Sequence, residues 1–113
     1  MKHDLIDGET VIDTWLLYYL PPYGGKYSGK LTVTDRRVLY KASGDASVAG
    51  VLGNIGASGE LDIGKQDIRN VEVQRSLFHK QAIVTLADGS RHVFDRGMMN
   101  VDKVAAAIGE GRL

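Results

Sequence analysis

Apolar and polar residues alternate with a period of two along most of the chain, and this pattern predicts strands. The first predicted strand, 10–20, carries Ile12, Leu16, Tyr18 and Leu20 on one apolar face. Its opposite face is mixed, which indicates partial cover by a helix or a partner chain. The mixed face consists of Val11, Asp13, Trp15, Leu17 and Tyr19.

Turn signals separate the later strands. In 29–41, two apolar stretches flank Asp35-Arg36, which predicts a tight hairpin. The Asp88-Gly89 pair predicts a second hairpin with a type I′ turn, because both central residues of that turn need positive φ. The remaining short strands are predicted at 61–63, 68–75, 82–86 and 92–94.

The period changes near the end of the chain. Val101, Val104, Ala105 and Ile108 recur at helical spacing and predict a short amphipathic helix. Asn100 is a suitable N-cap, and Gly109 can end the helix in the left-handed conformation. A helix of about ten residues is marginal alone, so we expect it to dock on the sheet.

This order of strands and helix, together with two motifs, resembles GRAM-type and bacterial pleckstrin-homology-like (PH-like) domains. The segment 29–40 contains Thr34-Asp35-Arg36-Arg37 between two strands, as in that family. A second landmark is a strand at 61–63 that runs into Asp67-Ile68 and Val71.

The resemblance covers residues 8–109 and implies a mainly β fold. The expected architecture is a PH-like barrel of about seven antiparallel strands in meander order, capped by a C-terminal amphipathic helix. We expect residues 1–113 to form a single domain with a Gly-rich loop at 44–59. Such barrels serve lipid-headgroup binding, peptide docking and scaffolding, so function depends on the site.

Composition narrows the classes of function. The 113 residues include 14 Lys+Arg, 14 Asp+Glu and no cysteine. Zero formal net charge argues against a general nucleic-acid binder, and the lack of cysteine excludes disulfides, zinc ribbons and thiol nucleophiles. No apolar run reaches the length of a membrane span or resembles a signal peptide. We therefore expect a cytoplasmic domain, which could be peripheral to a membrane.

Loop positions predict a basic end in this neutral chain. If loops alternate between the ends of a meander, the connections 21–28, 43–59 and 76–80 gather at one end. The candidate lipid-binding residues there are Lys26, Lys30, Lys41, Arg75, His79 and Lys80. The resemblance implies phosphoinositide binding by the first hairpin loop, where Lys26 and Lys30 lie. At about 1 kcal/mol for each cation, such a patch binds a membrane weakly, and an ordinary solvated face is the alternative.

Two further groups are candidates for protein contacts. Residues 44–59 contain five glycines, and Val48, Val51, Leu52 and Ile55 fall at helical spacing within them. They form either a short apolar face for a partner or a flexible loop. Tyr23 and Tyr27 lie in the first loop and could contact a peptide, whereas Tyr18 and Tyr40 are expected in the core or at its rim.

Catalytic motifs are missing from the sequence. His3, His79 and His92 have no metal-binding spacing, and no serine lies in a nucleophile motif. Of the Arg36-Arg37 pair, we expect Arg36 to face solvent and Arg37 to pair with an acid, with anion binding as the alternative.

We therefore expect a noncatalytic module without cofactor or metal. It would dock a protein partner or self-associate first, and bind anionic lipid headgroups weakly second. The competing hypothesis is a small-molecule binding barrel or minor enzyme that uses the open end of the barrel.

Overall fold

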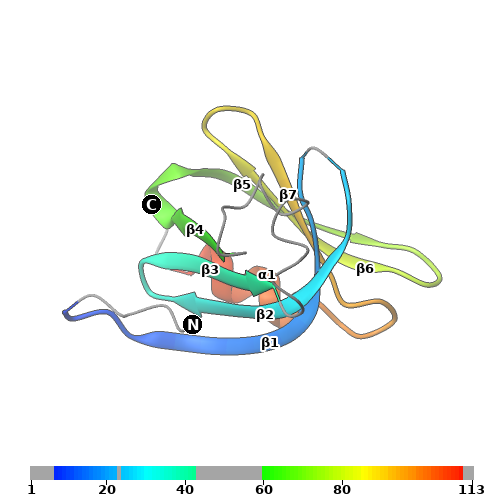
Figure 1. Ribbon diagram of the computed structural model, residues 1–113, viewed down its shortest axis with the longest axis horizontal. Coiled ribbons are helices and arrows are strands. Elements are labelled where there is room, and N and C mark those ends of the chain that lie inside the picture. Colours follow the sequence, from blue (N-terminus) through cyan, green and yellow to red (C-terminus); the bar gives the residue numbers. More distant parts are fainter. Residues whose placement is uncertain (1–6, 23, 43–59, 111–113) are drawn as a thin grey trace.

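Strands form most of the structure, a computed structural model that describes residues 7–22, 24–42 and 60–110. The elements follow the predicted order closely (Figure 1). They are β1 (Val11–Leu20), β2 (Tyr27–Thr34), β3 (Arg37–Ala42), β4 (Glu60–Gly64), the 3-10 turn η2 (Lys65–Asp67), β5 (Ile68–Arg75), β6 (Lys80–Leu86), β7 (Arg91–Asp95) and the helix α1 (Asp102–Gly109).

The seven strands form one antiparallel sheet in the order β4-β3-β2-β1-β7-β6-β5. Strand β1 belongs to both halves of this sheet: it pairs along its length with β2, and its last residues, Tyr18 to Leu20, also pair with β7. Figure 1 shows β1 curving from the β2–β4 half toward β7. The predicted fold class, seven antiparallel strands in meander-like order with one C-terminal helix, is confirmed.

The inner face of β1 is the mixed one. Leu17 and Tyr19 are 6% and 0% exposed, whereas Leu16 and Tyr18 on the more apolar face are 79% and 43% exposed. Both faces contain large apolar side chains, so alternation predicts the strand but does not decide which face is buried. The mixed face is covered by the hydrophobic core, to which the C-terminal helix contributes, so the expected cover by a helix is found.

Aromatic side chains fill the centre of the core. Tyr19, Tyr40 and Phe94 are each 0% exposed, and the Tyr19 ring centroid lies 5.2 Å from that of Tyr40 and 5.4 Å from that of Phe94. These spacings are within the range of favourable aromatic pairs. Val104 and Ile108 of α1 complete the core, because both are fully buried against it.

Helix α1 packs against β1, β2, β5 and β6, as its marginal length requires. Asn100 acts at its start, where Oδ1 accepts a hydrogen bond from the Asp102 N–H at 2.6 Å. Gly109 ends the helix without positive φ, so the predicted left-handed cap is wrong. The buried Lys65 ammonium caps the helix instead, donating to the carbonyls of Ala107 and Glu110 at 2.8 and 2.6 Å.

The hairpin between β6 and β7 is confirmed, but its predicted turn type is wrong. Gly89 has φ of 89°, whereas no described non-glycine residue, Asp88 included, has positive φ. The Leu86 N–H donates to the Ser90 carbonyl at 2.9 Å, so three residues form the connection. Such loops need only one left-handed residue.

Among the described residues, no helix is both long enough and apolar enough to cross a membrane.

Candidate functional site

The six basic candidate residues separate into two groups. Lys26, Lys30 and Lys41 belong to the β1–β3 half of the sheet, whereas Arg75, His79 and Lys80 lie at the turn between β5 and β6. The predicted common basic end is therefore wrong.

The pairing of β1 with β7 explains the separation. Tyr18 pairs with Asp95 at the end of β7 and Leu20 pairs with Val93 at its middle, so β1 runs toward the start of β7 and the β1–β2 loop lies toward the β6–β7 turn. The β5–β6 turn lies beside the other end of β7, where the Lys80 N–H donates to the Gly97 carbonyl. Figure 1 shows the β1–β2 loop and the β6–β7 turn together at the top and the β5–β6 turn at the right.

The prediction of a common basic end fails at the connection between β4 and β5. The alternation rule holds only where consecutive strands are sheet neighbours, but β4 and β5 lie at opposite edges of the sheet and are joined through η2. The sequence shows a short connection there, and nothing in its pattern reveals that it crosses between edges.

A row of residues crosses the outer face of β1–β3. Leu16 pairs with Lys30, Lys30 with Lys41, and Lys41 with Glu60, so the four side chains share one side of the sheet. Lys30 is exposed and Lys41 is half-buried. Lys30 lies opposite Lys41, and Glu60 lies opposite Lys41 on its other side, so the row carries two positive charges against one negative charge and keeps a positive excess.

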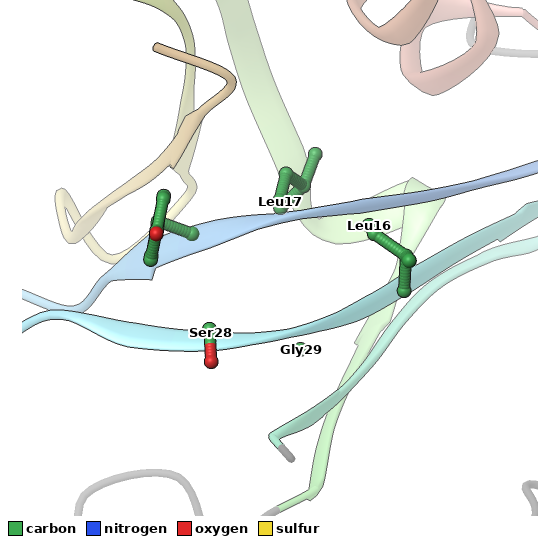
Figure 2. Close-up of a pocket in the computed structure, with 5 residues that line it drawn as sticks. Leu16, Leu17, Ser28 and Gly29 are labelled. Atoms are coloured by element: carbon green, nitrogen blue, oxygen red, sulfur yellow. The ribbon is translucent and has the colours of Figure 1, made fainter.

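A hollow of about 290 Å³ lies over β1 and β2 beside this row. It is lined by Leu16, Leu17, Tyr18, Ser28 and Gly29. Figure 2 shows Leu16 and Ser28 extending from one side of the strand pair and Leu17 from the other. Its rim is basic because the Lys26 ammonium lies 4.4 Å from the centre of the Tyr18 ring, a cation–π distance. We call the Leu16–Lys30–Lys41 row and this hollow the outer β1–β3 face.

The sequence pattern missed Leu16 and Ser28 as candidate site residues. For Leu16 a sequence signal existed. It lies in a strand with large apolar side chains on both faces, so exposure of one face would expose apolar side chains. Tyr40 lies in the core, as expected, whereas Tyr18 is at the rim of the hollow. Tyr27 is half-buried, and its carbonyl accepts a hydrogen bond from the Tyr40 hydroxyl at 2.7 Å.

The other candidate interaction residues belong to parts of the chain outside the described residues. They are Tyr23, Val48, Val51, Leu52 and Ile55, and the whole Gly-rich segment 44–59 lies outside as well.

Polar partners surround the second basic group. Arg75 pairs with Asp102 at the start of α1, His79 Nδ1 lies 2.9 Å from Asp95 Oδ2, and the Lys80 ammonium donates to the Ser76 carbonyl at 2.9 Å. Burial would raise the pKa of Asp95, but hydrogen bonds from Gln81, Gly97 and His79 lower it overall. This carboxylate, at the end of β7, is thus a buried anion beside the β5–β6 turn.

The Thr34–Arg37 hairpin is held by a network of hydrogen bonds and ion pairs. Arg37 forms a two-pronged hydrogen-bonded ion pair with the buried Glu9, at 2.8 and 2.7 Å, and its other nitrogen lies 2.8 Å from Asp62. The Thr34 hydroxyl donates to Glu9 and accepts from the backbone N–H groups of Arg36 and Arg37. Arg36 is exposed, as expected.

His92 is buried. Its Nδ1 lies 2.6 Å from the Tyr19 hydroxyl, and burial lowers the pKa of its imidazole despite the nearby Asp88 charge. Within residues 7–22, 24–42 and 60–110, no three His, Asp or Glu side chains gather as metal ligands.

No protein-family model and no curated protein sequence matches the chain. Among solved structures, it is similar to a crystal structure of the C-terminal domain of an unknown protein from Leishmania infantum, with a TM-score of 0.71 and 13% sequence identity. The match covers 93% of this chain and 85% of that one. At such low identity, the similarity shows the fold alone.

Proposed function

We propose that the chain is a noncatalytic interaction module of the GRAM/PH-like type that docks a segment of a protein partner on its outer β1–β3 face. Three features support the assignment to this type: the strand order, the C-terminal helix and the Thr34–Arg37 hairpin. Because a fold alone does not determine function, the support for the docking surface comes from the residues of that face.

The main support for the proposal is the exposure of Leu16. This side chain is 79% exposed in the middle of a strand, and it lines the hollow. An exposed leucine alone is ordinary. Here it adjoins a hollow of about 290 Å³, near the lower end of the range for small-molecule pockets. Such a hollow fits one or two apolar side chains of a peptide better than a complete ligand.

Charge favours an acidic partner. Lys26, Lys30 and Lys41 lie around the apolar centre, so a segment that presents carboxylates beside an apolar side chain complements the face in both respects. A second copy docked symmetrically through this face would bring the same lysines together, because a two-fold interface uses one patch on both subunits. An acidic partner is therefore the preferred occupant, and self-association is the other outcome.

A peptide selection tests the proposal. A library of random peptides displayed on phage is selected against the wild-type protein, and the enriched peptides are measured by fluorescence anisotropy. We expect Asp or Glu beside an apolar residue in these peptides, with binding at least about tenfold weaker to Leu16→Ser and Lys30→Glu. The matched control is Leu77→Ser, because Leu77 is equally exposed, at 76%, on the β5–β6 turn.

The proposal fails if no peptide is enriched, or if the enriched peptides bind both variants as tightly as wild type. Light scattering across the micromolar range separates the other occupant: an oligomer that Leu16→Ser dissociates would assign the face to self-association.

Two other predictions from the sequence stay predictions. Weak lipid binding by the first loop is tested by flotation with phosphoinositide vesicles and Lys26→Ala plus Lys30→Ala. The small-molecule or enzyme alternative requires a ligand inside the sheet, where Tyr19, Tyr40 and Phe94 occupy the described core.

A further inference from the structure

Four large apolar side chains are exposed at the tips of two loops. Leu77 and Phe78, in the β5–β6 turn, are 76% and 61% exposed, and Met98 and Met99, between β7 and α1, are 70% and 61% exposed. Turn positions are ordinarily polar, so two adjacent pairs of this kind are unusual.

Backbone hydrogen bonds hold the two loops side by side. The Lys80 N–H donates to the Gly97 carbonyl at 2.6 Å, and the Arg96 N–H donates to the Lys80 carbonyl at 3.0 Å. Figure 1 shows both loops projecting toward the same side, at the right of the molecule. We call Leu77, Phe78, Met98 and Met99 the paired loop tips.

The buried Asp95 fixes both loops from behind. Its Oδ2 lies 2.9 Å from His79 Nδ1 and accepts from the Gln81 side chain at 2.9 Å, while its Oδ1 accepts from the Gly97 N–H at 2.6 Å. Asp95 is 2% exposed, so its carboxylate is shielded from water, whereas the His79 side chain remains 52% exposed. The tips are therefore presented on a preorganised support, which reduces the entropy lost on binding.

Cations lie next to the tips. The segments 75–80 and 95–103 contain four Lys or Arg residues against two acids. One acid, Asp95, is buried, and the other, Asp102, pairs with Arg75. The Lys80 ammonium bonds the Ser76 carbonyl at the base of one tip, and the Arg96 guanidinium bonds the Asn100 carbonyl at the base of the other at 2.7 Å.

We infer that the paired loop tips insert into the interface of an anionic lipid bilayer. Apolar side chains at the apex with cations directly behind them match the layers of a membrane surface, in which acyl chains lie beneath anionic headgroups. The order of the layers favours a bilayer over a protein partner, because the apolar residues project from convex turns rather than lining a recess.

This surface is distinct from the one proposed for protein docking. The paired loop tips lie beside the end of β7, whereas the outer β1–β3 face belongs to the other half of the sheet. Membrane insertion and peptide docking can therefore be tested independently of each other.

Vesicle sedimentation tests the insertion. Wild type is mixed with vesicles of phosphatidylcholine alone or with added phosphatidylserine, and we expect binding mainly to the anionic vesicles. Leu77→Ser plus Phe78→Ser should weaken this binding at least about tenfold, since it removes two inserted side chains. Lys80→Gln should weaken it about fivefold, and Leu16→Ser should leave it unchanged.

A single label reports insertion directly. Because the chain has no cysteine, Phe78→Cys can carry one environment-sensitive fluorophore, with Leu16→Cys as the matched control. We expect a blue shift with anionic vesicles at position 78 and none at position 16 or with inorganic phosphate alone. Equal thermal unfolding of all variants establishes that each is folded.

Three results would overturn the inference: no wild-type binding to anionic vesicles, binding that the Leu77/Phe78 variant retains, or a label at 78 that stays in water. A change of oligomeric state in that variant, without loss of vesicle binding, would assign the tips to self-association instead.

Discussion

Single side chains join segments that are distant in the sequence. Arg37 is the clearest case, because its guanidinium bonds Glu9 before β1 and Asp62 in β4. The Glu9 side chain is 0% exposed and that of Arg37 is 15% exposed. The hydrogen bond with Glu9 is the main cause that raises the pKa of Arg37, so the pair stays charged at any ordinary pH.

Substitution of Arg37 should destabilise the folded protein. We expect Arg37→Met to lower the free energy of unfolding by about 3 kcal/mol, because it leaves the Glu9 carboxylate buried without its cation. Urea unfolding measures the change. Arg36→Gln is the matched control and should stay within about 0.5 kcal/mol of wild type, since Arg36 is exposed. Equal effects of the two substitutions would contradict the assigned role.

His92 makes stability depend on pH. Burial lowers the pKa of its imidazole below the ordinary 6.5, so between the two values the unfolded chain binds more protons than the folded one. Stability therefore rises with pH in this window, and it is lost as acidification passes 6.5 toward the lowered value. Both ring nitrogens of a protonated imidazole are donors, so protonation would fix Nδ1 as a donor toward the Tyr19 hydroxyl.

Thermal unfolding across this acid range is the measurement for His92. We expect His92→Gln to lose less stability than wild type on acidification, since glutamine keeps an acceptor for Tyr19 and does not titrate. An imidazole titration by NMR with a midpoint at or above 6.5 would contradict the prediction.

Among the elements, β2 has one position that admits no side chain. A Cβ on Gly29 would lie 2.7 Å from the Tyr40 hydroxyl oxygen and even closer to the Lys41 carbonyl of β3. We expect Gly29→Ala to destabilise the protein by about 1–3 kcal/mol through overpacking. Gly109→Ala is the matched control, because nothing lies within 4 Å of its Cβ. A Gly29→Ala protein as stable as the control would contradict the close approach.

Most elements could be predicted from the sequence, because alternation and turn residues are local signals. The buried face of β1 could not, since Leu16 and Leu17 are equally apolar and only the pairing partners decide between them. The capping of α1 by Lys65 could not be predicted either. Lys65 and Ala107 are distant in the sequence, and no local pattern identifies a lysine whose ammonium bonds the end of a helix.

On the scale of the whole molecule, the sheet separates two surfaces that the sequence had merged. Lys26 and Lys30 flank the outer β1–β3 face, whereas Lys80 lies behind the paired loop tips. The error arose at the β4–β5 connection, because strand order in a sheet depends on long-range pairing. Zero net charge thus coexists with two local basic groups, each next to exposed apolar side chains.

The most direct test of protein docking is a series of amide NMR spectra recorded while a selected acidic peptide is added. We expect shift changes concentrated at Leu16, Tyr18, Ser28 and Lys30, with the paired loop tips unaffected. Shift changes centred on Leu77 and Met98, or none near Leu16 at saturating peptide, would contradict this expectation.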